Sequence, residues 1–227
     1  MKKIIINGPI ISSDEKWIYD YFDEESTCAK DVSDALPLNG EAIEVTINSF
    51  GGYVDQGAEI YTILKSYNGD VTINVVAAYS AASVIAMAGD TVRMSPVGRM
   101  MIHNAASSNF GDYRDMDKQS EVLKNANDAL SNAYVNKTGL TKEEVLQMMD
   151  SETWFTAEKA VSKGFADEIM FESKDEMRLV ANAAGLLSNN IIKKMKIMKQ
   201  DEMNKPKNES PEEKVNPMAR FFFNTKN

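Results

Sequence analysis

The segment VTINVVAAYSAASVIAMA, residues 71–88, decides the expected fold because two different hydrophobic patterns meet in it without a break. Residues 71–77 are mostly apolar and rich in β-branched side chains, which is typical of a buried strand. Residues 81–88 are small and apolar, which favours a closely packed helix. Ser80 stands at the junction. A buried strand that runs directly into a helix is the repeating unit of α/β proteins.

The same alternation extends in both directions from this segment. Strands are predicted at residues 3–6, 9–11, 42–47, 92–94 and 100–102, the last two on either side of a turn at 95–98. Helices are predicted at residues 14–22, 58–64 and 115–135, and a further one starts at Thr141, where Glu144 completes a capping box. This order predicts an α/β domain with repeated strand–helix units, a largely parallel sheet and one long helix.

Composition and charge exclude several classes of protein. The 227 residues are 43% hydrophobic and carry a formal charge of −9, which argues against wholesale disorder and against nucleic acid as the main partner. Cys28 is the only cysteine, so an intrachain disulfide framework and CxxC motifs are excluded. His103 is the only histidine. A zinc site would need almost all carboxylate ligands, so no metal or cofactor is predicted, and any hydrolase that uses imidazole as its base must use His103.

The end of the chain differs in composition from the rest. Residues 193–227 hold nine basic and five acidic residues, whereas the first 192 hold 16 and 29. We therefore predict one large folded domain over residues 1–192, followed by a flexible basic tail over residues 193–227. The first residues are too short for a signal-peptide core, and the longest apolar stretch, residues 75–88, is too short to cross a bilayer. A soluble, cytoplasmic protein with no membrane partner is expected.

Three features could carry chemistry. Ser80 is expected at a helix N-terminus, where backbone N–H groups and the helix dipole favour a developing negative charge, although small residues there could serve close packing alone. The loop Ser49–Gly52 ends the preceding strand, and its paired glycines could turn an N–H group into a cleft or form a plain turn. It lacks the spacing of a nucleotide-binding loop. His103 follows a short apolar strand, a position in which histidine is more often structural than catalytic, but strand ends also line the active edge of an open α/β sheet.

A catalytic triad would also need a carboxylate that orients the imidazole. The downstream candidates are Asp150, Glu152 and Asp167. Physical reasoning on the residues alone does not rank them.

Taken together, the motifs INSFGG (47–52), AYS (78–80), MIH (101–103), WFTAEKA (154–160) and GFAD (164–167) resemble the ClpP family of serine peptidases. The resemblance spans about residues 3–171 and keeps the order of the motifs. It implies a crotonase-like fold in which subunits stack as two rings around a chamber and meet through the long helix that starts near Asp115.

The resemblance also implies the site. Ser80 matches the nucleophile and His103 the general base, and Glu152 matches the acid, whereas Asp167 matches a structural position. The N–H groups of Gly52 and Ala81 would form the oxyanion hole. No cofactor is implied.

Some features depart from the family pattern. Phe50 and Tyr79 replace the usual proline and small residue and could narrow the substrate groove, and Glu152 replaces the usual aspartate. The expected N-terminal segment for docking an unfoldase ATPase is missing from the sequence. Together with the basic tail and the run from Ser80 to Gly89, this resembles the ClpP-like head maturation proteases of phages and prophages.

The leading hypothesis is therefore an ATP-independent serine endopeptidase that cleaves capsid or scaffold proteins during phage head maturation. It would act as a homo-oligomer in the bacterial cytoplasm or inside the procapsid, without a Clp-type ATPase. The alternatives are an ATPase-dependent Clp protease subunit and an assembly or scaffold protein with secondary proteolysis. Acyl-CoA enzymes of the crotonase type share the fold, but if this chain were one of them, its pairing of a serine with a histidine would be accidental.

Overall fold

A computed structural model describes residues 1–172 together with Met195 and Lys199, and its first compact unit covers Met1–Lys174. The boundary predicted at residues 192 and 193, and the predicted flexible tail, lie outside the described residues. No helix in the described part of the chain is long and apolar enough to cross a membrane.

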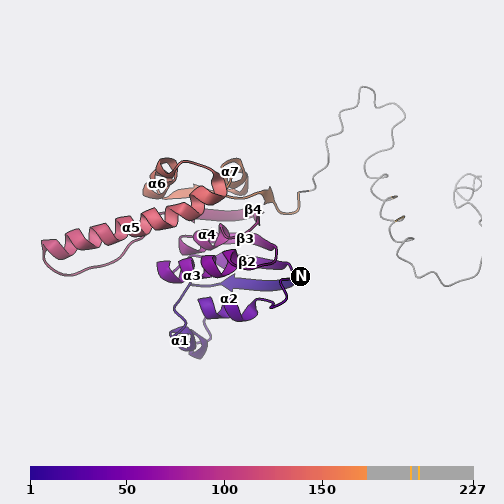
Figure 1. The fold of residues 1–227 in the computed structure, drawn as a ribbon, viewed down its shortest axis with the longest axis horizontal. Coiled ribbons are helices and arrows are strands. Elements are labelled where there is room, and N and C mark those ends of the chain that lie inside the picture. Colours follow the sequence, from indigo (N-terminus) through magenta and orange to yellow (C-terminus); the bar gives the residue numbers. More distant parts are fainter. Residues whose placement is uncertain (173–194, 196–198, 200–227) are drawn as a thin grey trace, which may run out of the picture. The chain divides into compact units, whose positions relative to one another are not determined.

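The unit is built on one six-stranded sheet, and Figure 1 shows strands β2, β3 and β4 lying side by side. The order is β1-β2-β3-β4-β5, and β6 also pairs with β4. The first four strands are parallel, while β5 runs antiparallel to β4. The strands are β1 (Lys2–Asn7), β2 (Ile43–Ser49), β3 (Val71–Tyr79), β4 (Thr91–Ile102), β5 (Thr153–Phe155) and β6 (Glu168–Ile169). The predicted α/β architecture with a largely parallel sheet is confirmed.

Helices follow most strands, and buried side chains of α2, α3 and α4 pack in the core against the sheet. They are α1 (Lys16–Tyr21), α2 (Ala29–Ala35), α3 (Val54–Lys65), α4 (Ala81–Ala86), α5 (Tyr113–Thr138), α6 (Lys142–Asp150) and α7 (Ala157–Ser162). Along β2 and β3, buried apolar residues alternate with half-buried polar ones, as in Ile43–Glu44–Val45 and Val71–Thr72–Ile73. This period of two places the apolar side chains in the core under the helices and the polar ones on the opposite face.

Strand β4 differs from its prediction. Two short strands around a turn were expected at 92–94 and 100–102, but the structure has one strand of 12 residues. The register with β3 passes from Val75↔Met94 to Ala77↔Arg99, so residues 95–98 form an enlarged bulge opposite the single residue Val76. Proline and glycine are tolerated in a strand at such a bulge.

Two helices near the N-terminus also differ from expectation. Helix α2 was not predicted, and the helix expected at residues 14–22 is only six residues long. Its large apolar side chains are mostly exposed, among them Trp17 (68%) and Tyr21 (78%).

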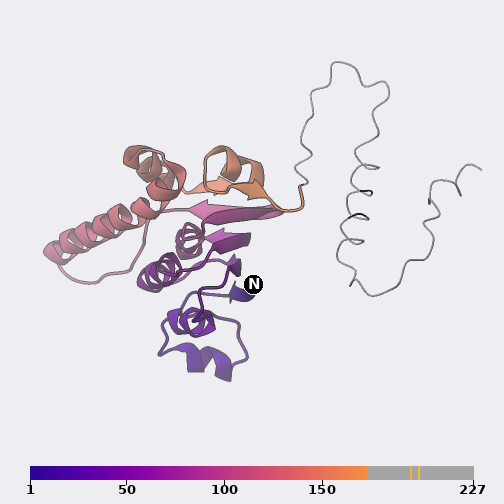
Figure 2. The same cartoon turned by 45° about the vertical axis from the view of Figure 1, so that its right-hand side comes forward.

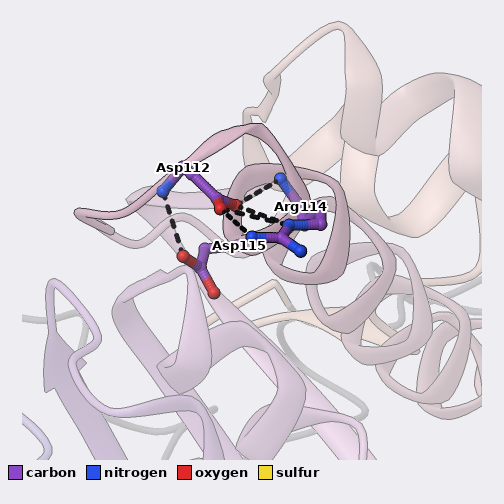
Figure 3. Close-up of polar contacts among 3 residues, drawn as sticks. All are labelled: Asp112, Arg114 and Asp115. Carbon is purple, nitrogen blue, oxygen red and sulfur yellow. Dashed lines mark hydrogen bonds and ion pairs between the residues drawn. The ribbon is translucent and has the colours of Figure 1, made fainter.

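The long helix α5 extends away from the body, as the views in Figures 1 and 2 both show. Its start is marked by a capping box. The side chain of Asp112 accepts the backbone N–H of Arg114 at 2.9 Å, and Asp115 accepts the N–H of Asp112 at 3.0 Å (Figure 3). The adjacent Arg114 guanidinium lowers the pKa of Asp112. At the other end, Gly139 adopts a left-handed conformation that stops the helix.

Candidate active site

The predicted nucleophile and base meet at the carboxyl ends of two adjacent parallel strands. Ser80 follows β3 directly and His103 follows β4, and Tyr79 is in register with Met101. The oxygen Oγ of Ser80 lies 2.7 Å from Nε2 of His103. At this hydrogen-bond distance, the imidazole of His103 can take the proton from the hydroxyl of Ser80.

Ser80 is held in an unusual backbone conformation, with φ 55° and ψ −127°. A residue with a side chain pays about 1–3 kcal/mol for such a conformation, which persists only where its surroundings enforce it. The backbone N–H of Ser80 donates to the carbonyl of Met101 at 3.0 Å, and its carbonyl accepts the N–H of Ser83 at 2.9 Å. The sharp turn between β3 and α4 leaves the serine side chain half-buried, with its Oγ in contact with His103.

The glycine loop after β2 packs against this turn. A side-chain carbon on Gly51, where φ is +95°, would lie 2.7 Å from Cβ of Ser80 and 2.7 Å from the carbonyl oxygen of Tyr79. Gly52 is equally crowded, because an added Cβ would lie 2.1 Å from the carbonyl oxygen of Ile10. Only glycine fits at either position. Sequence reasoning assigned the loop to an oxyanion hole but did not single out Gly51 as the residue that contacts the nucleophile turn.

Two backbone N–H groups near Ser80 remain available. Within residues 1–172, neither Gly52 nor Ala81, the first residue of α4, donates its N–H to a protein acceptor. Unpaired donors beside a nucleophile are what an anionic tetrahedral intermediate requires.

The carboxylate of Glu152, the predicted acid, has a partner other than His103. The antiparallel register pairs Met101 with Trp154 and Ile102 with Thr153, and His103 and Glu152 are the residues that adjoin the last of these pairs in sequence. Glu152 has a positive φ of 47°, and its Oε1 accepts a hydrogen bond from Nε1 of Trp154 at 3.1 Å. Among the described residues, no carboxylate is hydrogen-bonded to His103.

The other two carboxylates that the sequence left open have different partners. Asp150 accepts a hydrogen bond from the side chain of Asn104 at 2.7 Å. Asp167 accepts the N–H of Val92 at 2.6 Å and pairs with Lys137 at 2.7 Å, so it joins β4 to α5. Asp167 therefore has the contacts of a structural residue.

Aromatic side chains line the surroundings of Ser80. The Tyr79 ring lies 5.3 Å from that of Phe50 and 4.9 Å from that of Trp154, and the Arg99 guanidinium lies 5.9 Å from the Trp154 ring centre. We call Phe50, Tyr79 and Trp154 the aromatic row. Phe50 is 76% exposed and Trp154 43% exposed, so the row offers apolar surface beside the site. Sequence reasoning pointed to Phe50 and Tyr79 but not to the contact with Trp154.

Comparison with known proteins identifies the family. Residues 28–173 match the Clp protease family. The chain belongs to this family.

Two curated relatives match 60% and 69% of this chain. The ATP-dependent Clp protease proteolytic subunit 2 of Tropheryma whipplei is 30% identical over 166 residues, which cover 69% of this chain and 90% of the relative. The ATP-dependent Clp protease proteolytic subunit of Deinococcus radiodurans is 31% identical over 138 residues, covering 60% and 68%. A ClpP1 mutant from Listeria monocytogenes has a similar fold, with a TM-score of 0.62 and 23% identity over 77% of this chain and 93% of that one.

Family membership confirms the predicted ClpP fold and the predicted class of enzyme, since Clp proteases are serine endopeptidases. Members of the family form ring-shaped oligomers. The described residues hold no group of three or more His, Cys, Asp or Glu side chains placed to bind a metal ion.

Proposed function

We propose that this chain hydrolyses peptide bonds with Ser80 as the nucleophile and His103 as the general base. The observation that carries the proposal is the 2.7 Å contact between Ser80 Oγ and His103 Nε2, at a turn where Ser80 has a strained backbone. The N–H groups of Gly52 and Ala81 stabilise the oxyanion. Glu152 is the acid that orients His103, after a side-chain rotation releases it from Trp154.

The reaction follows from these positions. Ser80 Oγ attacks the carbonyl carbon of the substrate while its proton passes to His103 Nε2, and the carbonyl oxygen becomes an oxyanion. The intermediate collapses, the amine leaves with the proton from His103, and an acyl group remains on Ser80. His103 then takes a proton from water, which attacks the ester carbon. The second intermediate collapses as the bond to Ser80 Oγ breaks, His103 returns the proton to Ser80 Oγ, and the acid product is released. A carboxylate on the other ring nitrogen stabilises the imidazolium in both steps.

Covalent labelling tests this assignment. A fluorophosphonate should modify the native protein at Ser80, as mapped by mass spectrometry, and not at Ser83, whose hydroxyl is buried. The variant Ser80→Ala should assemble normally and lose several orders of magnitude in peptidase rate. Labelling that persists in Ser80→Ala would refute the proposed nucleophile.

For the biological role, we propose an ATP-independent endopeptidase that cleaves capsid or scaffold proteins during phage head maturation, acting as a homo-oligomer. The proposal is supported by the resemblance of the run from Ser80 to Gly89 to that subgroup and by the basic composition of residues 193–227. Exposed apolar side chains along α5, such as Met116 and Val122, provide a surface for self-association.

The names of the relatives favour a second candidate, a proteolytic subunit that works with a Clp-type ATPase. The two candidates differ in what they can degrade. The purified protein should cleave an unfolded protein such as reduced casein without nucleotide, and its activity on a folded substrate should not rise when a Clp-type ATPase and ATP are added. ATP-dependent degradation of the folded substrate, or co-purification with the ATPase, would establish the second candidate instead.

A third reading, an assembly protein with secondary proteolysis, makes a different prediction. Co-expression of Ser80→Ala with the capsid and scaffold proteins would then still yield mature heads. The proposed protease requires that this variant blocks cleavage of those proteins while the intact chain cleaves them.

A further inference from the structure

The hydroxyl of Ser83 lies in a buried chain of hydrogen bonds that ends at the backbone of Ser80. Ser83 is completely buried, and its Oγ lies 2.6 Å from the carbonyl oxygen of Ser80 and 2.8 Å from the hydroxyl of Tyr134. A serine has one hydroxyl hydrogen, and a carbonyl oxygen can only accept. Ser83 therefore donates to Ser80, and Tyr134 donates to Ser83.

These hydrogen bonds reach the backbone at Ser80, which is the strained residue. Ser80 has a positive φ of 55°, and its N–H is held by the carbonyl of Met101 at 3.0 Å. On the other side, the Ser80 carbonyl accepts both the N–H and the hydroxyl of Ser83. The backbone N–H and the carbonyl of Ser80 are thus both held by hydrogen bonds, while the Ser80 hydroxyl contacts His103. The Ser83 hydroxyl adds a bond that the helix alone does not supply.

Tyr134 connects the same chain of bonds to helix α5. The buried residues of this helix of 26 residues are Ser131, Ala133 and Tyr134, close to its C-terminal end. The Tyr134 ring lies 5.8 Å from that of Phe165, which in turn lies 4.6 Å from Phe155. Burial raises the pKa of the Tyr134 hydroxyl, so it stays protonated and able to donate. A phenylalanine would fill the same space without this bond.

We propose that Ser83 and Tyr134 are positioning residues that hold the strained Ser80 backbone and keep its Oγ directed at His103. The inference rests on the proposed role of Ser80 as the nucleophile. Because Tyr134 belongs to α5, two hydrogen bonds link the packing of that helix against the rest of the unit to the backbone geometry of Ser80. Loss of either hydroxyl slows the attack of Ser80 without altering the surface that binds substrate.

The test uses the full-length protein and the variants Ser83→Ala, Tyr134→Phe and the double variant. Three quantities are measured: the rate of fluorophosphonate labelling at Ser80, and kcat and KM for a short fluorogenic peptide. Each single variant should lower kcat and the labelling rate by about tenfold, because a small misplacement of a reacting group is costly, while KM stays within about twofold. Since both hydroxyls act through one chain of bonds, the double variant should be no slower than Ser83→Ala.

Measuring the stability of the variants to denaturant distinguishes this positioning role from simple packing. Ser83→Ala leaves the buried Tyr134 hydroxyl without a partner, so the double variant should be more stable to denaturant than Ser83→Ala. The matched control is Ser131→Ala, which removes a fully buried serine hydroxyl on α5 whose bond goes to Asp128 within the helix, at 2.7 Å. This control should lose some stability but keep the labelling rate and kcat of the unmodified chain.

Several outcomes would overturn the inference: labelling rates in Ser83→Ala and Tyr134→Phe equal to that of the Ser131→Ala control, losses that multiply in the double variant, or changes confined to KM. If Ser83→Ala fails to fold, Tyr134→Phe alone decides, because it keeps the ring in place. Labelling of the unmodified chain at Ser80 shows separately whether the proposed function holds, whatever the variants do.

Discussion

The carboxylate oxygen Oε1 of Glu152 accepts a hydrogen bond from the indole N–H of Trp154 at 3.1 Å. Glu152 immediately precedes β5, the strand that pairs with the end of β4 just before His103. The Glu152 side chain is therefore bonded to the aromatic row and not to His103. Under the mechanism we propose, Glu152 exchanges this bond for one to His103.

The first prediction concerns the identity of the acid. Glu152→Gln should lower kcat by about two to four orders of magnitude, because the imidazolium loses its stabilising charge and the tautomer is no longer fixed. Asp150→Asn should have a much smaller effect, since Asp150 is bonded to Asn104. Steady-state kinetics on a short peptide measures both.

Two further variants of the protein serve as controls for this prediction. Trp154→Phe removes the competing indole N–H, so it should leave kcat unchanged or raise it, and Glu152→Asp should retain most activity. A larger loss in Asp150→Asn than in Glu152→Gln would mean that the acid has been assigned to the wrong position.

The second prediction concerns the glycine loop. Gly51→Ala should destabilise the fold by about 1–3 kcal/mol or more and abolish labelling of Ser80, because the added Cβ meets the Ser80 side chain and the Tyr79 carbonyl. Gly139→Ala is the matched control, since Gly139 also has a positive φ (+73°) but has no atom within 4 Å of an added Cβ. It should cost only backbone strain, about 1 kcal/mol, and leave the labelling rate intact. Urea unfolding and labelling kinetics on both variants check this.

The third prediction concerns the cap of α6, the helix that leads into the turn bearing Glu152. The Thr141 N–H and hydroxyl both donate to Glu144, and these bonds lower the pKa of that carboxyl from its usual 4.5. A lowered folded-state pKa means that the ionised carboxylate stabilises the fold above the ordinary pKa and that this contribution is lost as the pH falls through the folded value. The difference in unfolding free energy between the unmodified chain and Glu144→Gln should therefore be largest near neutral pH and shrink below about pH 4.5. A difference that does not change with pH would contradict this.

The fourth prediction concerns residues 193–227, with their nine basic and five acidic residues. Truncation after Ile192 should leave the cleavage of short fluorogenic peptides nearly unchanged. It should slow the cleavage of a capsid or scaffold substrate, because a tethered binding segment raises the effective concentration of a partner to about the millimolar range. Equal rates of protein cleavage for the full-length and truncated enzymes, at low and moderate salt, would mean that these residues are dispensable.

Local patterns along the chain were sufficient for the strand–helix alternation, the capping box at Thr141 and the junction at Ser80, because each depends on residues close together in sequence. The motif order and the single histidine were sufficient to pair His103 with Ser80. The contact at 2.7 Å between them was not visible in any local pattern, but it follows once their strands are neighbours in a parallel sheet.

Contacts between distant residues decided the rest. Whether residues 92–102 form two strands or one depends on pairing with β3, which absorbs Pro96 and Gly98 in a bulge. The partner of Glu152 depends on a side-chain rotamer, and the bond between Ser83 and Tyr134 joins residues 51 positions apart. Periodicity reports which face of an element is apolar, but it carries no information on which side chain from another element meets that face. For this protein, the sequence by itself determined the fold class and the candidate nucleophile and base, and the tertiary structure decided what holds them in place.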